Sequence, residues 1–213
     1  CLMIQSALRV SYTSPKVMHW ITELLVWLFD NESERPRLAD EAECIAAEAV
    51  ANGFFEKSLE EMGEYDLQEY NSEDYAFGVR TPHIVFNYLD YLLWKENKEK
   101  YNDFVFEFRN SVEHWYPQHP SEGTIEPWDG RDVFGNLCII SRSVNSKFSN
   151  LSPESKMKSY KKMVQKGSLK LRIMGDIIER GTSETWRLSE CAKHEEEMIS
   201  LLCEAVQEAI EEE

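Results

Sequence analysis

The chain has 213 residues, of which 42% are hydrophobic, so it can bury the core of one large or two small domains, and wholesale disorder is excluded. Its 39 acidic and 23 basic residues give a net charge of −16, which excludes a general attraction of the whole molecule to polyanions. Any contact with nucleic acid must therefore be local.

The sequence shows neither a membrane-spanning stretch nor a signal peptide. The best apolar stretch, 20–29, is interrupted by Thr22 and Glu23 and falls short of the ~20 residues that a spanning helix needs. The first five residues lack an initiator Met, a basic region and a cleavage site. The five cysteines are widely spaced without a Cys-x-x-Cys pair, which excludes a zinc knuckle and indicates a reducing compartment. We expect a cytoplasmic piece of a longer protein.

The N-terminal half is expected to be helical. Apolar residues at helical spacing predict helices over 14–30, 38–61 and 82–97, and the first of these has Ser14 as its N-cap and a proline at its first helical position. The aromatic residues on the same stripes are expected to form the core of a helical bundle. Residues 64–74 are acidic, aromatic and weakly periodic, and they predict a loop.

After residue 103 the apolar residues recur at every second position. Phenylalanines at alternate positions predict a half-buried strand over 103–109, and a turn-rich stretch over 117–135 leads to a second short strand at 137–140. A short helix or turn is expected at 143–150, and helices from 153 onward. The fold class is therefore mainly α with a small α+β core.

This order of elements suggests three consecutive segments. Residues 1–102 form an N-terminal helical region, residues 103–170 form the α+β core, and residues 171–213 form C-terminal helices that pack on the core.

The charge is unevenly distributed along the sequence. Residues 142–172 contain nine basic residues and one acidic residue, which gives this segment a local charge of +8. A charge run of this kind is often only the solvated face of a helix. Here it begins where the motif described next ends, which makes it a candidate for contact with phosphates.

Three short elements form the chemical motif. Glu113-His114 is followed by Pro117-Gln118, then by Gly135-Asn136-Leu137, and Asn145 comes nine residues after the first Asn. An isolated Glu-His pair near a proline is most simply a surface pair, because prolines are common. The combination of acid-His-x-x-Pro-Gln at a strand end, Gly-Asn-Leu at the next strand and a helical Asn is far more specific.

These residues resemble the HNH, or His-Me finger, nucleases, and most closely the C-terminal nuclease domain of GmrSD-like restriction proteins. The resemblance covers 112–147, and the chain departs from it by having Trp115-Tyr116 where Ile and a variable residue are usual. It implies a ββα-metal core and metal-dependent DNA endonuclease activity in bacterial restriction and antiviral defence. It also implies an N-terminal nucleotide-hydrolysing domain in the full-length protein, of which this sequence contains no sign.

The resemblance also assigns roles to residues. His114 would be the general base, suited to it by an ordinary pKa near 6.5, and Asn136 would complete the catalytic centre by holding the loop behind His114. Glu113 and Asn145 would bind a divalent ion, Mg²⁺ or alternatively Mn²⁺, which needs only one or two protein oxygens. Contacts with DNA phosphates are expected from six basic residues: Arg142, Lys147, Lys156, Lys158, Lys161 and Lys162.

Several alternatives stay open from sequence alone. A helical module with an inactive HNH core that only binds nucleic acid or protein is the main rival to an enzyme. His119, five residues after His114, is either a further metal ligand or a solvent-facing loop residue. The sequence also does not distinguish modified from plain DNA, nicking from double-strand cleavage, or a monomer from an oligomer.

Overall fold

The computed structural model describes residues 1–31, 37–121, 125–181, 186 and 189–211. The chain forms two compact units, each assembled from separate stretches of sequence, whereas the sequence predicts three consecutive segments. The first unit contains Cys1–Glu69, Pro82–Phe108 and Leu201–Glu213, and the second contains Tyr70–Thr81 and Arg109–Ser200. No helix among the described residues is long and apolar enough to span a membrane.

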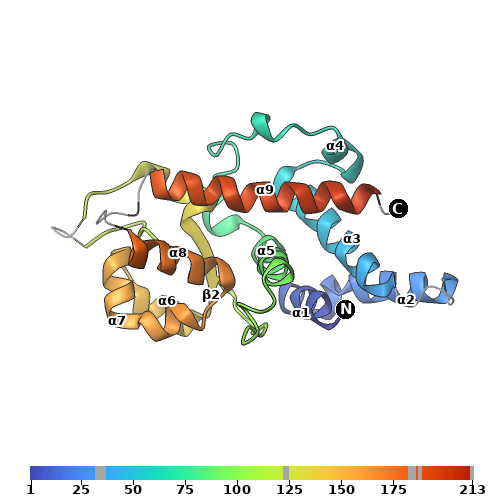
Figure 1. Cartoon of the computed structure of the whole chain (residues 1–213), viewed down its shortest axis with the longest axis horizontal. Helices are drawn as coiled ribbons and strands as arrows, with labels where there is room; N and C mark the ends of the chain where they lie inside the picture. Colours follow the sequence, from blue (N-terminus) through green and yellow to red (C-terminus); the bar gives the residue numbers. More distant parts are fainter. Residues whose placement is uncertain (32–36, 122–124, 182–185, 187–188, 212–213) are drawn as a thin grey trace. The chain divides into compact units, whose positions relative to one another are not determined.

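The first unit is helical (Figure 1). Within it, α3 packs against α1, α2 and α5, and α1 packs along α5. Buried alanines on α3 allow this close approach. The helices are α1 (Leu2–Ser11), α2 (His19–Asp30), α3 (Leu38–Val50), α4 (Leu59–Gly63), α5 (His83–Glu96) and the C-terminal part of α9 (Ser189–Glu211).

The predicted helices of this unit are present but shorter, and α1 was not predicted. The helix predicted over 82–97 is confirmed as α5. The one predicted over 38–61 ends early, because a π-helical turn follows α3 and Glu56 adopts a left-handed conformation at φ 56°. Ser58 then starts α4 through a capping box with Glu61, which satisfies backbone N–H groups that a continuous helix would have used. Ser14 caps only a short 3₁₀ turn before α2.

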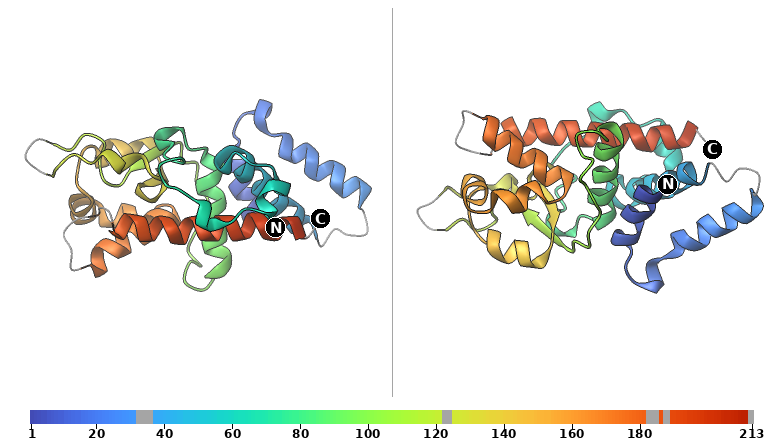
Figure 2. Two further views of the ribbon diagram at one scale, coloured as in Figure 1. Left: turned by 90° about the horizontal axis from the view of Figure 1, so that it is seen from above. Right: turned by 60° about the horizontal axis from the view of Figure 1, so that its bottom comes forward.

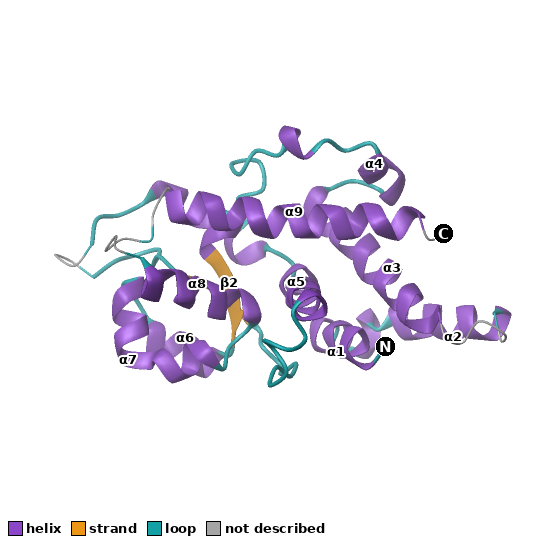
Figure 3. Ribbon diagram, in the orientation of Figure 1, coloured by secondary structure: helices purple, strands orange, loops and turns teal. Residues whose placement is uncertain are grey.

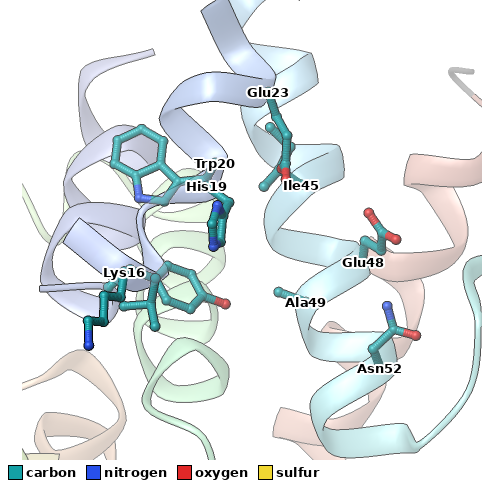
Figure 4. Close-up of a pocket in the computed structure, with 10 residues that line it drawn as sticks. Lys16, His19, Trp20, Glu23, Ile45, Glu48, Ala49 and Asn52 are labelled. Atoms are coloured by element: carbon teal, nitrogen blue, oxygen red, sulfur yellow. The ribbon is translucent and has the colours of Figure 1, made fainter. Parts of the chain in front are cut away.

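A pocket of about 370 Å³ opens in the first unit between α2 and α3 (Figure 4). Its polar lining includes His19 and Glu23 from α2 and Glu48 from α3. None of the residues that the sequence nominates for catalysis or metal binding lines it.

The second unit contains the only sheet among the described residues, a two-stranded antiparallel hairpin shown in orange in Figure 3. β1 (Ser111–His114) pairs with β2 (Leu137–Ile140) so that Glu113 lies opposite Cys138. Helices α6 (Arg142–Phe148), α7 (Pro153–Gln165) and α8 (Leu169–Arg180) follow β2 directly, and α7 packs against α8 (Figure 2). This unit also contains the N-terminal part of α9 and the 3₁₀ turns η5 (Gly78–Arg80), η6 (Asp129–Asp132) and η7 (Phe134–Asn136).

The fold class is confirmed, since the chain is mainly helical with a small sheet, but the first strand lies later than predicted. Residues 104–110 have no regular secondary structure, and β1 begins at Ser111. A strand needs a hydrogen-bonding partner, and β2 offers only four residues, whose register selects 111–114. The second strand, 137–140, and the short helix near 143–150 are where the sequence predicts them.

The two faces of the hairpin have different neighbours. Glu113 and Cys138 share one face by their pairing, and that face joins the hydrophobic core beneath the helices. Val112 and His114 project to the other face because side chains alternate along a strand. The core consists of Trp115, Tyr116, Cys138, Ile140, Phe148, Met157, Val164, Leu171, Met174, Trp186 and Cys191.

Gly135, just before β2, lies where the N-terminal part of α9 comes closest to the hairpin. A Cβ atom at this position would lie 2.6 Å from the backbone oxygen of Cys191 and 2.7 Å from Cβ of Glu195. We expect Gly135→Ala to lower the free energy of unfolding by about 1–3 kcal/mol or more, because the helix backbone must move. Denaturant titration of the full chain measures this.

The matched control is Gly63→Ala at the end of α4, where the new Cβ would meet only the Ile210 side chain at 3.5 Å. It should be neutral or stabilising by up to ~1 kcal/mol. Equal free energies of unfolding for the two variants would contradict the close approach at Gly135.

Candidate functional site

His114, the predicted base, lies at the end of β1 and pairs with a carboxylate that the sequence did not nominate. Its Nε2 is 2.7 Å from Oδ1 of Asp132 in η6. The His114 side chain is 6% exposed, whereas that of Asp132 is 38% exposed. Burial lowers the pKa of His114 below its ordinary value, although the hydrogen bond and charge of Asp132 oppose the shift. The imidazole is therefore neutral at neutral pH, the form that can accept a proton.

Asn136 is fully buried and makes four side-chain hydrogen bonds. Its Nδ2 donates to the carbonyls of Tyr116, at 3.0 Å, and Arg131, at 2.8 Å. Its Oδ1 accepts from the Tyr116 N–H at 2.8 Å and from the Trp186 indole at 3.1 Å. All the usual capacity of the amide is used, so Asn136 holds the chain just after His114.

Glu113, a predicted metal ligand, lies on the core face of β1 beside a buried lysine. Nζ of Lys156 is 2.7 Å from Oε1 of Glu113 and donates hydrogen bonds of 2.8 Å to the carbonyls of His114 and Trp115. Burial raises the pKa of Glu113, which Lys156 opposes, and burial lowers the pKa of Lys156, which Glu113 opposes. The ammonium thus holds the end of β1 against α7.

Asn145, the second predicted metal ligand, lies on α6 over the same strand. Its Nδ2 donates a 2.5 Å hydrogen bond to the hydroxyl of Ser111. Ser111 and Glu113 are two residues apart on β1 and therefore share a face. The structure thus brings Glu113 and Asn145 to one face of the hairpin, and His114 to the other.

A divalent ion fits the donor chemistry of that face. Oε1 of Glu113 meets Lys156, but no described residue donates a hydrogen bond to Oε2 of Glu113 or to the amide oxygen of Asn145. Mg²⁺ requires only one or two such oxygens besides water and phosphate. The described residues contain no group of three or more His, Cys, Asp or Glu side chains able to form a metal cage. Any metal held here would therefore depend on water and substrate for most of its coordination.

A second buried lysine holds the start of β2. Nζ of Lys170 lies 3.0, 3.3 and 2.8 Å from the carbonyl oxygens of Phe134, Gly135 and Leu137. It also lies 3.2 Å from Nε2 of His194, whose pKa burial lowers well below its ordinary value, so this histidine is neutral. Lys170 and His194 are thus structural partners of the hairpin.

The basic segment 142–172 divides into buried and exposed residues. The prediction that Lys156 contacts DNA is wrong, because its side chain is fully buried, donates hydrogen bonds to two backbone carbonyls and forms an ion pair with Glu113. Lys161 forms an ion pair with Glu179 of α8. The other predicted phosphate contacts, Arg142, Lys147, Lys158 and Lys162, are exposed.

Comparison with known proteins assigns the chain to a family. The profile of the family described as GmrSD restriction endonucleases, C-terminal domain, matches residues 64–201. The chain belongs to this family. The match includes the hairpin, all three helices that follow it and most of α9. Membership in this restriction endonuclease family indicates a nuclease role with DNA as substrate. No curated protein and no solved structure matches the chain.

Sequence reasoning missed several residues around the predicted site. Asp132 is separated from His114 by 18 residues, and only its place in an acidic turn before Gly-Asn-Leu hinted at a role. Lys170 and Trp186 gave no signal that distinguishes a buried hydrogen-bond donor from a surface lysine or a core aromatic. His119, the alternative ligand, is exposed on the loop.

The buried ion pair gives a prediction about stability. Lys156→Ala would leave the Glu113 carboxylate and two carbonyls without their donor. Breaking a buried pair in this way costs roughly 3–5 kcal/mol, and we expect a loss of that size in the free energy of unfolding, measured by denaturant titration. Lys158→Ala, an exposed position on the same helix, should change it by less than ~0.5 kcal/mol. Similar values for the two variants would show that the pair contributes little.

Proposed function

We propose that this domain is a metal-dependent HNH-type DNA endonuclease that hydrolyses phosphodiester bonds in bacterial restriction and antiviral defence. The observation that carries the proposal is the order β1, β2, α6, with Glu113 and Asn145 on one face of the hairpin and His114 at the strand end. That order is the one expected of a ββα-metal core. In this proposal the chain acts in the cytoplasm beside a nucleotide-hydrolysing domain of the full-length protein.

In the proposed chemistry, one side of the strand end transfers a proton and the other side binds the metal ion. His114, neutral and buried, takes the proton of the attacking water. Glu113 and Asn145 would hold the ion, with Mg²⁺ favoured over Mn²⁺, and the bound ion would neutralise charge on the phosphate and the departing oxygen. Asn136 fixes the backbone after His114, so that the imidazole does not move away during proton transfer.

The exposed basic residues of α6 and α7 would contact the DNA backbone. Lys158 and Lys162 are both exposed on α7, on either side of a kink at Tyr160, whose backbone is not helical. At ~0.15 M salt the Debye length is about 8 Å, so distant acidic residues do not cancel their attraction for a nearby phosphate. Local binding to DNA is thus compatible with a net charge of −16.

One observation favours the rival function, an inactive module that binds nucleic acid or protein. The Glu113 carboxylate is already paired with Lys156 and is 7% exposed. An ion must approach its second oxygen next to the ammonium, which weakens binding by repulsion. Metal-dependent cleavage distinguishes the two functions directly.

Replacing the proposed base should separate cleavage from binding. We expect the full chain to nick supercoiled plasmid only with Mg²⁺ or Mn²⁺, and His114→Ala to slow this by ~10²- to 10⁴-fold. DNA affinity should not change, because the imidazole moves a proton and does not hold the backbone. Single-turnover cleavage and fluorescence anisotropy measure the two quantities.

His119→Ala is the matched control, because His119 is exposed in the loop five residues away, and its cleavage rate should equal that of the wild type. Wild-type turnover by the His114 variant would remove His114 as the base. DNA binding without any metal-dependent cleavage by the wild type would favour the inactive module.

The two exposed lysines of α7, Lys158 and Lys162, give a prediction about salt dependence. Each phosphate neutralised contributes roughly −0.9 to the slope of log K against log salt concentration on duplex DNA. Lys158→Glu combined with Lys162→Glu should therefore weaken affinity and make the slope less negative by up to about 2.

The control pair is Lys98→Glu with Lys100→Glu, which changes the net charge equally at two exposed positions after α5. It should leave the slope unchanged. If both pairs change the slope alike, net charge governs binding, and Lys158 and Lys162 have no special role.

A further inference from the structure

The carboxylate beside His114 has no role in the chemistry proposed above, and its geometry suggests one. We propose that Asp132 is the positioning residue of His114, which fixes the imidazole proton on Nε2 and leaves Nδ1 as the nitrogen that accepts a proton. The proposal about the tautomer stands on geometry alone, and its consequence for cleavage rests on the proposed nuclease function.

The hydrogen-bond chemistry of the pair assigns the proton. An ionised carboxylate only accepts hydrogen bonds, so at 2.7 Å from Oδ1 of Asp132 the Nε2 of a neutral His114 must carry the hydrogen. Nδ1 then keeps its lone pair, and no described residue donates a hydrogen bond to it. Asp132 therefore both orients the ring and selects which nitrogen is basic.

Asn136 ties the two partners to one another through the backbone. The same Nδ2 donates to the carbonyl of Tyr116, two residues after His114, and to the carbonyl of Arg131, the residue before Asp132. The chain segments that carry the imidazole and the carboxylate are thus held by a single buried amide. This amide therefore helps to set the separation between the imidazole and the carboxylate.

Gly78 provides the space for the carboxylate. It has φ +54°, and a Cβ atom there would lie 2.7 Å from Oδ1 and 3.1 Å from Cγ of Asp132. Any other residue at this position would displace the oxygen that meets His114. By contrast, Asp129, at the start of the same turn, is fully exposed and lies 3.9 Å from Arg131. Of the two acidic residues in η6, only Asp132 pairs with His114 and lies against Gly78.

The tautomer can be read directly from the full chain labelled with ¹⁵N-histidine, without metal or DNA. Long-range ¹H–¹⁵N spectra at a pH where the ring is neutral distinguish a protonated Nε2 from a protonated Nδ1, and the spectrum of His114→Gln assigns the signals. We expect the wild type to show only the Nε2–H form. A wild-type ring protonated on Nδ1 would overturn the proposal, whether or not any variant folds.

Variants of Asp132 test whether its carboxylate is the cause of the single His114 tautomer. Asp132→Asn and Asp132→Ala should lose the single tautomer, while Asp129→Ala, the matched control in the same turn, should keep it. Thermal unfolding of each variant shows whether the fold persists. A tautomer unchanged in a folded Asp132→Ala protein would mean that the surrounding backbone, and not the carboxylate, orients the ring.

Cleavage assays then connect the tautomer with the chemistry. Asp132→Asn should reduce the turnover rate by ~10²-fold or more with little change in KM, because the substrate still binds but the base is misdirected. Asp132→Glu should recover part of this loss, and Asp129→Ala should retain the wild-type rate. An Nε2–H tautomer in a wild type that does not cleave would reject the nuclease function and leave the Asp132–His114 pairing intact. Normal cleavage by Asp132→Asn would reject the positioning role alone.

Discussion

The backbone carbonyls at the ends of a very short hairpin are the constraint on which the second unit depends. Each strand has only four residues, so the backbone just after β1 and just before β2 has few hydrogen-bonding partners within the sheet. A buried carbonyl without a donor costs roughly 1–3 kcal/mol. Lys156 supplies donors after β1, and Lys170 supplies them before β2. Asn136 adds hydrogen bonds from its amide to the carbonyls of Tyr116 and Arg131. The hairpin is therefore held by side chains from helices that follow it in sequence.

This requirement places functional groups on both faces of one strand. Glu113 meets Lys156 because that ammonium is already bound to the carbonyls of His114 and Trp115. His114, the next residue, turns to the opposite face and meets Asp132. The same buried network thus fixes the backbone from which His114 and Glu113 project, whereas Asn145 projects from α6. Neutralisation of Glu113 by Lys156 makes it possible to bury a carboxylate there, and it also sets the electrostatic cost of binding a metal ion beside it.

The basic segment of the sequence serves two purposes that composition alone does not separate. Lys156 and Lys170 are fully buried and donate to the backbone, whereas Lys158 and Lys162 remain exposed on α7. Periodicity on a helix predicts which residues share a face, but a lysine on the inner face normally indicates a register error, because burying an ammonium is costly. Here that cost is offset because each ammonium donates hydrogen bonds to carbonyls at the ends of the hairpin, which would otherwise lack a donor. The surface charge available for DNA is thus smaller than the local +8 suggests.

From the sequence alone, the helical class and the second strand could be predicted because they depend on local spacing and residue chemistry. The resemblance to HNH nucleases nominated Glu113, His114, Asn136 and Asn145. Residues 104–110 show the limit of this approach. Their alternating phenylalanines predict a strand, but a strand forms only where a partner strand is available, and these residues have no regular secondary structure. Two features could be known only from the folded structure: Lys156 of the basic segment is buried, and Asp132, 18 residues after His114, pairs with that histidine. Such contacts join residues that are distant in sequence, and they arise from unsatisfied donors and acceptors in the folded interior, which no local pattern records.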